Sequence, residues 1–116
     1  MKAHQRDILL IKFSEDIQEH YVVCLTPEHI NTEEWAFLGI MITDSLIYDK
    51  ENNYSFPVNN DMFDKHFLKN DYSKVRLYLI NYLPIRAIIK KVAQMKTQYY
   101  RKMIDELREK VLLNEI

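Results

Sequence analysis

The chain has 116 residues, which is enough for one domain and too few for two. Apolar residues make up 47% of it and charged residues 28%, which excludes a disordered tail, and no apolar run approaches the ~20 residues of a membrane-spanning helix. The net charge of −1 hides an asymmetry, because residues 1–58 carry 4 Lys/Arg against 10 Asp/Glu whereas residues 59–116 carry 12 against 7. The basic half either attracts phosphate or pairs with the acidic half inside one fold.

The first half of the chain predicts strands separated by short polar links. Residues 7–13 and 20–26 are short apolar runs without helical period, so they predict two buried strands joined as a hairpin. Pro27 ends the second run, and residues 27–31 predict a turn or a single helical turn. Residues 34–43 are almost continuously apolar, which predicts a third strand in the centre of the sheet.

The second half predicts three more strands. Residues 54–58 form a short strand, and Pro57 inside it indicates an edge position. Residues 59–72 are irregular. Residues 74–83 alternate, which predicts a half-buried strand, and residues 88–92 predict a last short one.

The clearest element is a terminal helix over about residues 97–114. Thr97 is the expected N-cap. One helical stripe is apolar, and its members are Tyr100, Met103, Ile104, Leu107 and Val111. Because so short a helix is unstable alone, we expect this stripe to pack on the sheet.

These elements predict a mainly β fold that forms one domain over residues 1–116: a closed, strongly bent antiparallel sheet of five or six short strands, followed by a helix. Gly39 is the only glycine, which excludes a glycine-rich phosphate loop. Cys24 lies in an apolar strand and is expected in the core, and a single cysteine provides no disulfide framework. The chain has no apolar stretch of signal-peptide type at its start, so we expect a soluble, cytoplasmic protein without membrane contact.

Several segments, taken in order, resemble the PemK/MazF/Kid toxins of bacterial toxin–antitoxin pairs. Residues 6–13 look like that family's opening strand, and residues 22–31 like its second strand with the following turn. Residues 39–44, 68–78 and 89–95 are similar to three of its later segments, namely V-P-I-T-S, L-K-x-x-S-x-V-R-x-D and K-K-I-G-x-L.

The resemblance implies an SH3-like, PemK-like barrel of five to seven short antiparallel strands with a C-terminal helix. It also implies a metal-independent endoribonuclease that cleaves single-stranded RNA through attack of the ribose 2′-hydroxyl on the adjacent phosphate. No cofactor is implied. The implied partners are RNA, a cognate antitoxin with an acidic disordered tail, and a second copy of the chain.

Three residues are candidates for catalysis. Thr43 and Arg76 match the family's phosphate-site threonine and the arginine of its R-x-D element, and ordinary strand chemistry explains both equally well. His20 stands where the family has arginine, so a permanent cation is lost, although histidine serves as an acid or base near neutral pH. The alternative for His20 is a solvent-facing side chain at a strand start.

Candidate RNA-binding residues follow the catalytic ones along the chain. Tyr78 replaces the family's aspartate and is a poor base at neutral pH, but it can stack on a nucleobase. The other four are Asn81, Arg86, Lys90 and Lys91, and a solvated face is the more common explanation for the three basic ones. The histidines lack metal-ligand spacing, so no metal site is expected.

The departures at His20 and Tyr78 leave a second function open, in which a catalytically decayed barrel binds protein or nucleic acid. A homodimer is expected for two reasons. The family resemblance implies one, and a core of this size leaves limited room for Trp35, Phe37 and Tyr82.

Overall fold

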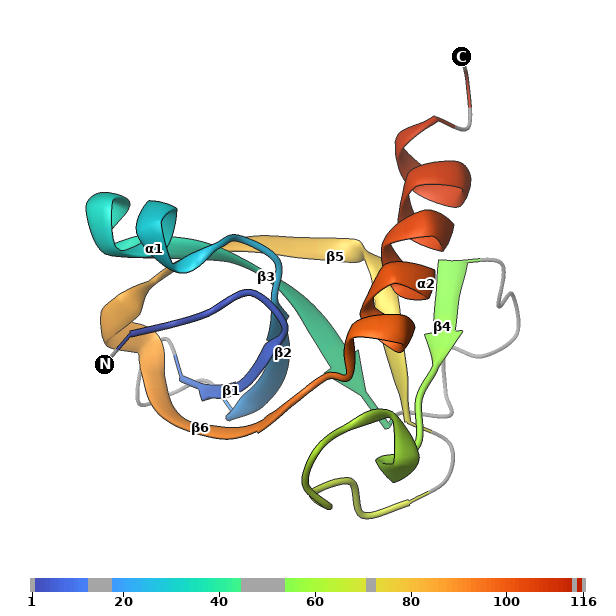
Figure 1. The fold of residues 1–116 in the computed structure, drawn as a ribbon, viewed down its shortest axis with the longest axis horizontal. Coiled ribbons are helices and arrows are strands. Elements are labelled where there is room, and N and C mark those ends of the chain that lie inside the picture. Colours follow the sequence, from blue (N-terminus) through green and yellow to red (C-terminus); the bar gives the residue numbers. More distant parts are fainter. Residues whose placement is uncertain (1, 13–17, 45–53, 71–72, 114, 116) are drawn as a thin grey trace.

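The structure, a computed structural model, describes residues 2–12, 18–44, 54–70, 73–113 and 115. These residues form one sheet of six antiparallel strands in the order β4-β5-β3-β2-β1-β6. The strands are β1 (Asp7–Ile11), β2 (His20–Cys24), β3 (Ala36–Thr43), β4 (Ser55–Pro57), β5 (Lys74–Pro84) and β6 (Ile88–Gln94). They curve into an open ring (Figure 1). The predicted mainly β fold with a strongly bent sheet is confirmed, as are the central place of β3 and the edge place of β4.

The helices differ from the sequence prediction at their ends. Helix α1 (Glu28–Glu34) makes two turns where residues 27–31 predicted one at most, so Glu34 is helical and β3 begins at Ala36. Trp35 joins the two in the left-handed conformation, with a φ of 55°. Two short 3-10 helices, η2 (Asn60–Met62) and η3 (Ile85–Ala87), precede and follow β5. In the described part of the chain, no helix has both the length and the apolar character that a membrane crossing requires.

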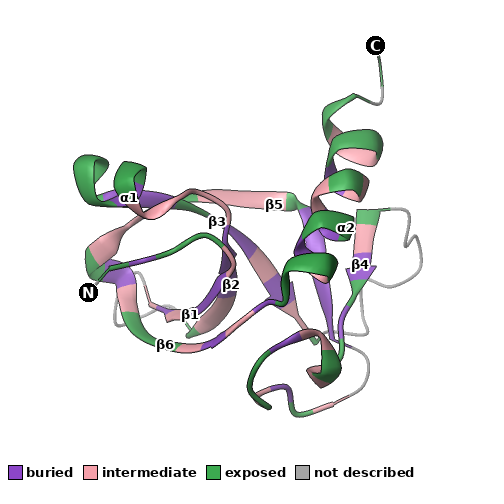
Figure 2. Ribbon diagram, in the orientation of Figure 1, coloured by how far each residue is buried: buried purple, intermediate pink, exposed green. Residues whose placement is uncertain are grey.

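The terminal helix consists of α2 (Thr97–Leu107) and one π-helical turn, η4 (Arg108–Leu112), so it ends at residue 112 and not at 114. The N-cap is Lys96, without a side-chain cap bond, because its backbone N–H still donates to Met62 O and keeps the chain extended there. The predicted apolar stripe is confirmed, since Met103 and Leu107 are buried in the core (Figure 2).

Both faces of the sheet bury an apolar cluster. One face packs on α2 and on the segment after β4, with Val23, Ile40 and Val75 fully buried. The concave face buries Phe37 and Leu83 in a second, smaller cluster. Phe37 therefore has room inside the core, and the expectation that it is crowded out was wrong. Buried Cys24, as expected, belongs to the concave cluster, and burial raises the pKa of its thiol.

Strand β5 bends sharply where it changes partners. Ile40 pairs with Ile80, and Ile42 pairs with Val75, so a step of two residues along β3 matches a step of five residues along β5. Extra residues in one strand bend it and increase its twist. Beyond the bend, β5 also pairs with β4, through Val75 and Phe56.

Backbone pairing joins the two ends of the curved sheet. Phe63, which follows β4 and η2, forms an antiparallel bridge with Met95, just beyond β6. Asp64 N donates to Gln94 O at 3.0 Å, and Gln94 N donates to the Asp64 carboxylate at 2.7 Å. The segment after β4 thus closes the ring against the end of β6.

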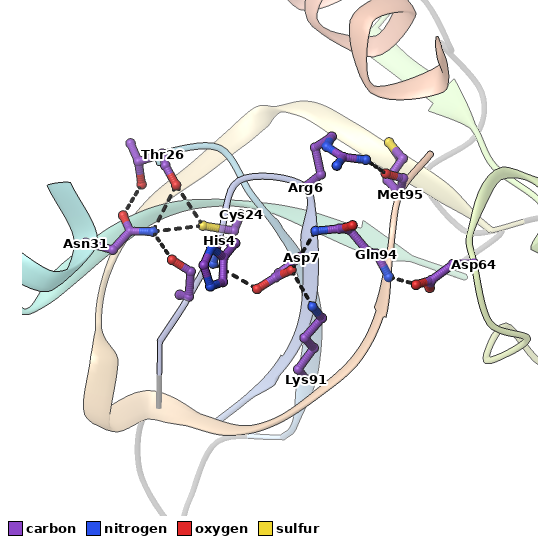
Figure 3. Close-up of polar contacts among 11 residues, drawn as sticks. His4, Arg6, Asp7, Cys24, Thr26, Asn31, Asp64, Lys91, Gln94 and Met95 are labelled. Carbon is purple, nitrogen blue, oxygen red and sulfur yellow. Dashed lines mark hydrogen bonds and ion pairs between the residues drawn. The ribbon is translucent and has the colours of Figure 1, made fainter. Parts of the chain in front are cut away.

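Buried polar side chains tie the N-terminal segment to the ring (Figure 3). The amide of fully buried Asn31 donates to Ala3 O at 2.8 Å and to Thr26 O at 2.9 Å, and its oxygen accepts from the Thr26 hydroxyl at 2.6 Å. The fully buried Asp7 carboxylate accepts from His4 N at 2.8 Å and pairs with Lys91 Nζ at 2.9 Å. These contacts hold β1 between β2 and β6.

Arg6 adopts a φ of 77°, a conformation that costs a residue with a side chain about 1–2 kcal/mol. Arg6 N donates to Cys24 O, Arg6 O accepts from Met95 N, and its guanidinium donates to Met95 O at 2.7 Å. These bonds offset the strain and link β2 to the end of β6.

We expect Asn31→Ala to lower the free energy of unfolding by about 2–4 kcal/mol, because it leaves buried groups of Ala3 and Thr26 without their partner. Urea unfolding followed by circular dichroism measures this. Thr32→Ala, on the exposed side of the same helix, is the control, with an expected loss under about 1 kcal/mol. Equal losses for both variants would contradict the anchoring role of Asn31.

Candidate functional site

A cleft of about 380 Å³ opens at the end of the sheet where β2 begins and β3 ends. Its walls combine polar strand ends with apolar side chains of the segment between η2 and β5. The lining residues are Gln18, Glu19, His20, Tyr21, Ile42, Thr43, Asp44, Phe67, Leu68, Lys69 and Ser73. The cleft therefore contains two of the three predicted catalytic residues, His20 and Thr43.

Strand register places His20 beside Thr43. Tyr21 pairs with Ile42, so one further step along both antiparallel strands sets His20 opposite Thr43. Directly opposed residues point to the same face of a sheet and lie about 5 Å apart. An imidazole and a hydroxyl thus share the concave face at the mouth of the cleft.

Arg76, the third predicted catalytic residue, does not line the cleft. Arg76 pairs with Ser55 of β4. It lies two residues after Lys74, the β5 residue that pairs with Thr43. Its side chain is buried, and Nη1 donates to the Tyr78 hydroxyl at 3.0 Å. Tyr78 is half exposed and packs edge-on against Tyr54. Arg76 and Tyr78 therefore form a unit next to the cleft.

The other predicted RNA-binding residues lie apart from the cleft. Asn81 pairs with Gly39 and shares a strand face with buried Leu83. Arg86 and Lys90 are exposed on η3 and β6. Lys91, also on β6, is held by its ion pair with Asp7. In the described part of the chain these residues do not gather into one site with His20.

Two carboxylates, those of Glu19 and Asp44, line the cleft and were not among the predicted site residues. Asn70 bridges the cleft wall, because its amide donates to the Asp44 carboxylate at 3.3 Å and its oxygen accepts from the Ser73 hydroxyl at 3.2 Å. Lys69 is the one basic residue among the described lining residues. The cleft thus carries both signs of charge.

No sequence pattern singled out Lys74. It lies on β5 and pairs with Thr43 of β3, whereas His20 lies on β2, on the other side of β3. Lys74 is only 4% exposed. Burial lowers the pKa of its ammonium, and the nearby charge of Arg76 lowers it further. Its alternation with Val75 was visible in the sequence, but the register that sets it next to Thr43 was not.

No group of three or more His, Cys, Asp or Glu residues that could hold a metal ion occurs within the described ranges. The chemistry available at the cleft is that of one imidazole, one ammonium, three hydroxyls and two carboxylates, which belong to His20, Lys69, Tyr21, Thr43, Ser73, Glu19 and Asp44. Such groups exchange protons and donate hydrogen bonds to oxyanions.

Solved structures share this fold, although no protein-family model matches the sequence and no curated protein matches it. MazF from Deinococcus radiodurans superposes with a TM-score of 0.71 at 10% identity, covering 93% of this chain and 94% of that chain. The Mycobacterium tuberculosis toxin MazF-mt6 gives 0.67 at 14%, covering 89% and 93%. A mycobacterial endoribonuclease in complex with its cognate antitoxin gives 0.72 at 8%, covering 97% and 95%.

The chain is thus a bent β-barrel protein with a C-terminal helix. Its fold is that of the MazF toxins. The resemblance noted in the sequence is confirmed at the level of the fold, and the low identity marks a strongly diverged chain.

We expect Lys74 to stabilise the folded chain more as the pH rises. Because its pKa is lower in the folded than in the unfolded chain, the unfolded chain binds more protons between those two values, and the contribution of Lys74 to the free energy of unfolding rises up to about pH 10.4. Urea unfolding of the wild type and of Lys74→Met between about pH 8 and 10.5 measures this. As the pH rises, the free energy of unfolding of the wild type should increase relative to that of Lys74→Met. A difference between the two that stays constant with pH would contradict the lowered pKa.

Proposed function

We propose that the chain is the toxin component of a toxin–antitoxin pair and cleaves single-stranded RNA. The observation that carries the proposal is the placement of His20 beside Thr43 in the cleft of a MazF-like fold. The names of the structural neighbours add support, because they include a toxin, an endoribonuclease and a complex with a cognate antitoxin. A cytoplasmic location is part of the proposal, because the proposed substrate is cellular RNA.

The proposed reaction needs no nucleophile from the protein. A base removes the proton of a ribose 2′-hydroxyl, and the oxygen attacks the adjacent phosphorus. The bond to the 5′-oxygen of the next nucleotide breaks, and an acid protonates that oxygen. The products are a 2′,3′-cyclic phosphate and a free 5′-hydroxyl.

The cleft residues fit separate parts of this reaction. His20 is the acid–base group, because imidazole exchanges a proton near neutral pH. The Thr43 hydroxyl, about 5 Å away across the strands, donates to a phosphate oxygen. Arg76 supplies positive charge from the next row of the sheet, and the half-exposed ring of Tyr78 offers a base-stacking surface. Asn81, Arg86, Lys90 and Lys91 are proposed contacts to flanking nucleotides.

Cleavage of an unstructured RNA oligonucleotide, with products analysed by mass spectrometry, tests the proposal. The wild type should yield 2′,3′-cyclic phosphate and 5′-hydroxyl ends. His20→Ala should lower the rate about 10²–10⁴-fold, the usual contribution of a general acid or base. Lys65→Ala, an exposed control outside the cleft, should cleave like the wild type. Absence of cleavage by the wild type, together with absence of toxicity on induction in a bacterial host, would refute the enzyme.

The rate should also change with pH between about 5.5 and 7.5, because histidine is the side-chain type that changes charge there. Initial rates of the wild type and of His20→Ala across this window measure the effect. A flat profile in the wild type, with His20→Ala still active, would eliminate the histidine mechanism and leave the fold assignment intact.

A second function rests on the charge of the cleft. Glu19 and Asp44 repel a phosphate, and Arg76 lies outside the lining. These features favour a barrel that has lost catalysis and binds a protein or a nucleic acid. Oligonucleotide binding or antitoxin binding without any cleavage would identify this second function.

A homodimer is part of the proposal. Trp35 is 78% exposed and Tyr82 68%, and Leu38, which pairs with Tyr82, is also exposed. Exposed large apolar side chains, such as the Leu38–Tyr82 pair across β3 and β5, are typical of an interface.

We expect sedimentation equilibrium at micromolar concentration to give about 28 kDa, twice the chain mass of 14.1 kDa. Tyr82→Ser combined with Trp35→Ser should weaken the association, because both changes remove apolar contact area. The matched double variant Tyr54→Ser with Leu112→Ser, exposed on β4's side and on the terminal helix, should leave it unchanged. A wild-type monomer of 14.1 kDa would contradict the dimer.

A further inference from the structure

Lys74 is a buried lysine at the end of the sheet where the cleft opens. It is the first residue of β5, it pairs with Thr43 on one side and with Pro57 of β4 on the other, and only 4% of it is exposed. Lysine is rarely buried unless a partner offsets the loss of hydration of its ammonium. Lys74 meets this condition, since it takes part in an interaction within the chain.

Register puts Lys74 in one row with the two cleft residues of the concave face. Going across the sheet, the row contains His20 on β2, Thr43 on β3 and Lys74 on β5. Neighbouring strands lie about 4.8 Å apart. The four-carbon stem of lysine is about 6 Å long, so the ammonium of Lys74 can reach a group bound over Thr43.

The cleft needs such a cation if it is to hold a phosphodiester. Its described lining provides Lys69 against the carboxylates of Glu19 and Asp44. Arg76 directs Nη1 to Tyr78, away from the Thr43 row. Lys74, like Arg76, is not itself among the lining residues, but strand pairing sets it directly against Thr43, which is.

We propose that Lys74 is a phosphate-binding residue, which holds an RNA phosphodiester over Thr43 together with the hydroxyl of that threonine. The inference rests on the proposed function, since it names the group that binds the backbone of the proposed substrate. Burial and Arg76 lower the pKa of Lys74, and a bound anion would oppose both effects because it favours the charged ammonium. Lys74 also interacts within the chain, so the phosphate joins or replaces an existing contact.

Binding of a fluorescent 2′-O-methyl RNA 12-mer, which lacks the attacking hydroxyl, tests the inference without cleavage. Anisotropy titrations at several KCl concentrations between 25 and ~200 mM give the affinity and its salt slope. Lys74→Met should weaken binding about tenfold or more, as expected for loss of one charged hydrogen bond, and should reduce the salt slope by ~0.7. Lys102→Met, on the exposed face of α2, removes the same charge and should bind like the wild type. Lys74→Arg should retain most of the affinity.

The outcomes separate this inference from the proposed function. If the wild type binds and cleaves RNA while Lys74→Met keeps its affinity and salt slope, the phosphate role of Lys74 is refuted and the nuclease stands. If the wild type neither binds the 12-mer nor cleaves RNA, both proposals fail.

A measurement on the wild type covers the case in which Lys74→Met does not fold. Lysine-selective ¹³Cε NMR, with the Lys74 signal assigned from Lys74→Arg, should show this signal shifting when the 12-mer is added. A Lys74 signal that stays in place while other lysine signals shift would overturn the inference.

Discussion

The pairing of β3 with both β2 and β5 is the constraint on which the rest of the molecule depends. It fixes the row that runs from His20 through Thr43 to Lys74. A slip of one residue in either pairing would turn these side chains to the opposite face and bury polar groups in the core against α2. The apolar residues adjacent to the row, Ile42 and Val75, resist that slip because they are buried. Packing on one face of the sheet therefore specifies the arrangement of polar groups on the other.

The bend in β5 explains why some candidate residues meet and others do not. Between Val75 and Ile80 the strand carries more residues than its partner β3 and turns toward β4. Arg76 and Tyr78 lie in this bend, so they leave the Thr43 row and form their own contact. A straight strand would have continued the row along β3.

The low identity with structures of the same fold follows from what maintains that fold. The ring is closed largely by backbone bonds, such as those between residues 62–64 and 94–96, and by apolar side chains that tolerate substitution when volume and pattern are kept. Individual positions can then change while the register persists. Arg6 illustrates this: it adopts a φ of 77°, suited to glycine, and its guanidinium and backbone bonds offset the strain.

Hydrophobic pattern by itself determined most of the fold. The period-two and unbroken apolar runs located all six described strands to within a few residues, Pro57 marked the edge strand, and the stripe through Met103 and Leu107 identified the terminal helix. The ends of α1 and α2 were not determined, because Trp35 and Lys96 take conformations set by the strands and loops that they join. The resemblance of the sequence to the MazF family also made His20, Thr43 and Arg76 candidates. Only the tertiary structure decided that His20 and Thr43 share a cleft, that Lys74 joins their row and that Arg76 does not. Those relations depend on register and on a bend between residues far apart in the chain, and no local pattern encodes either.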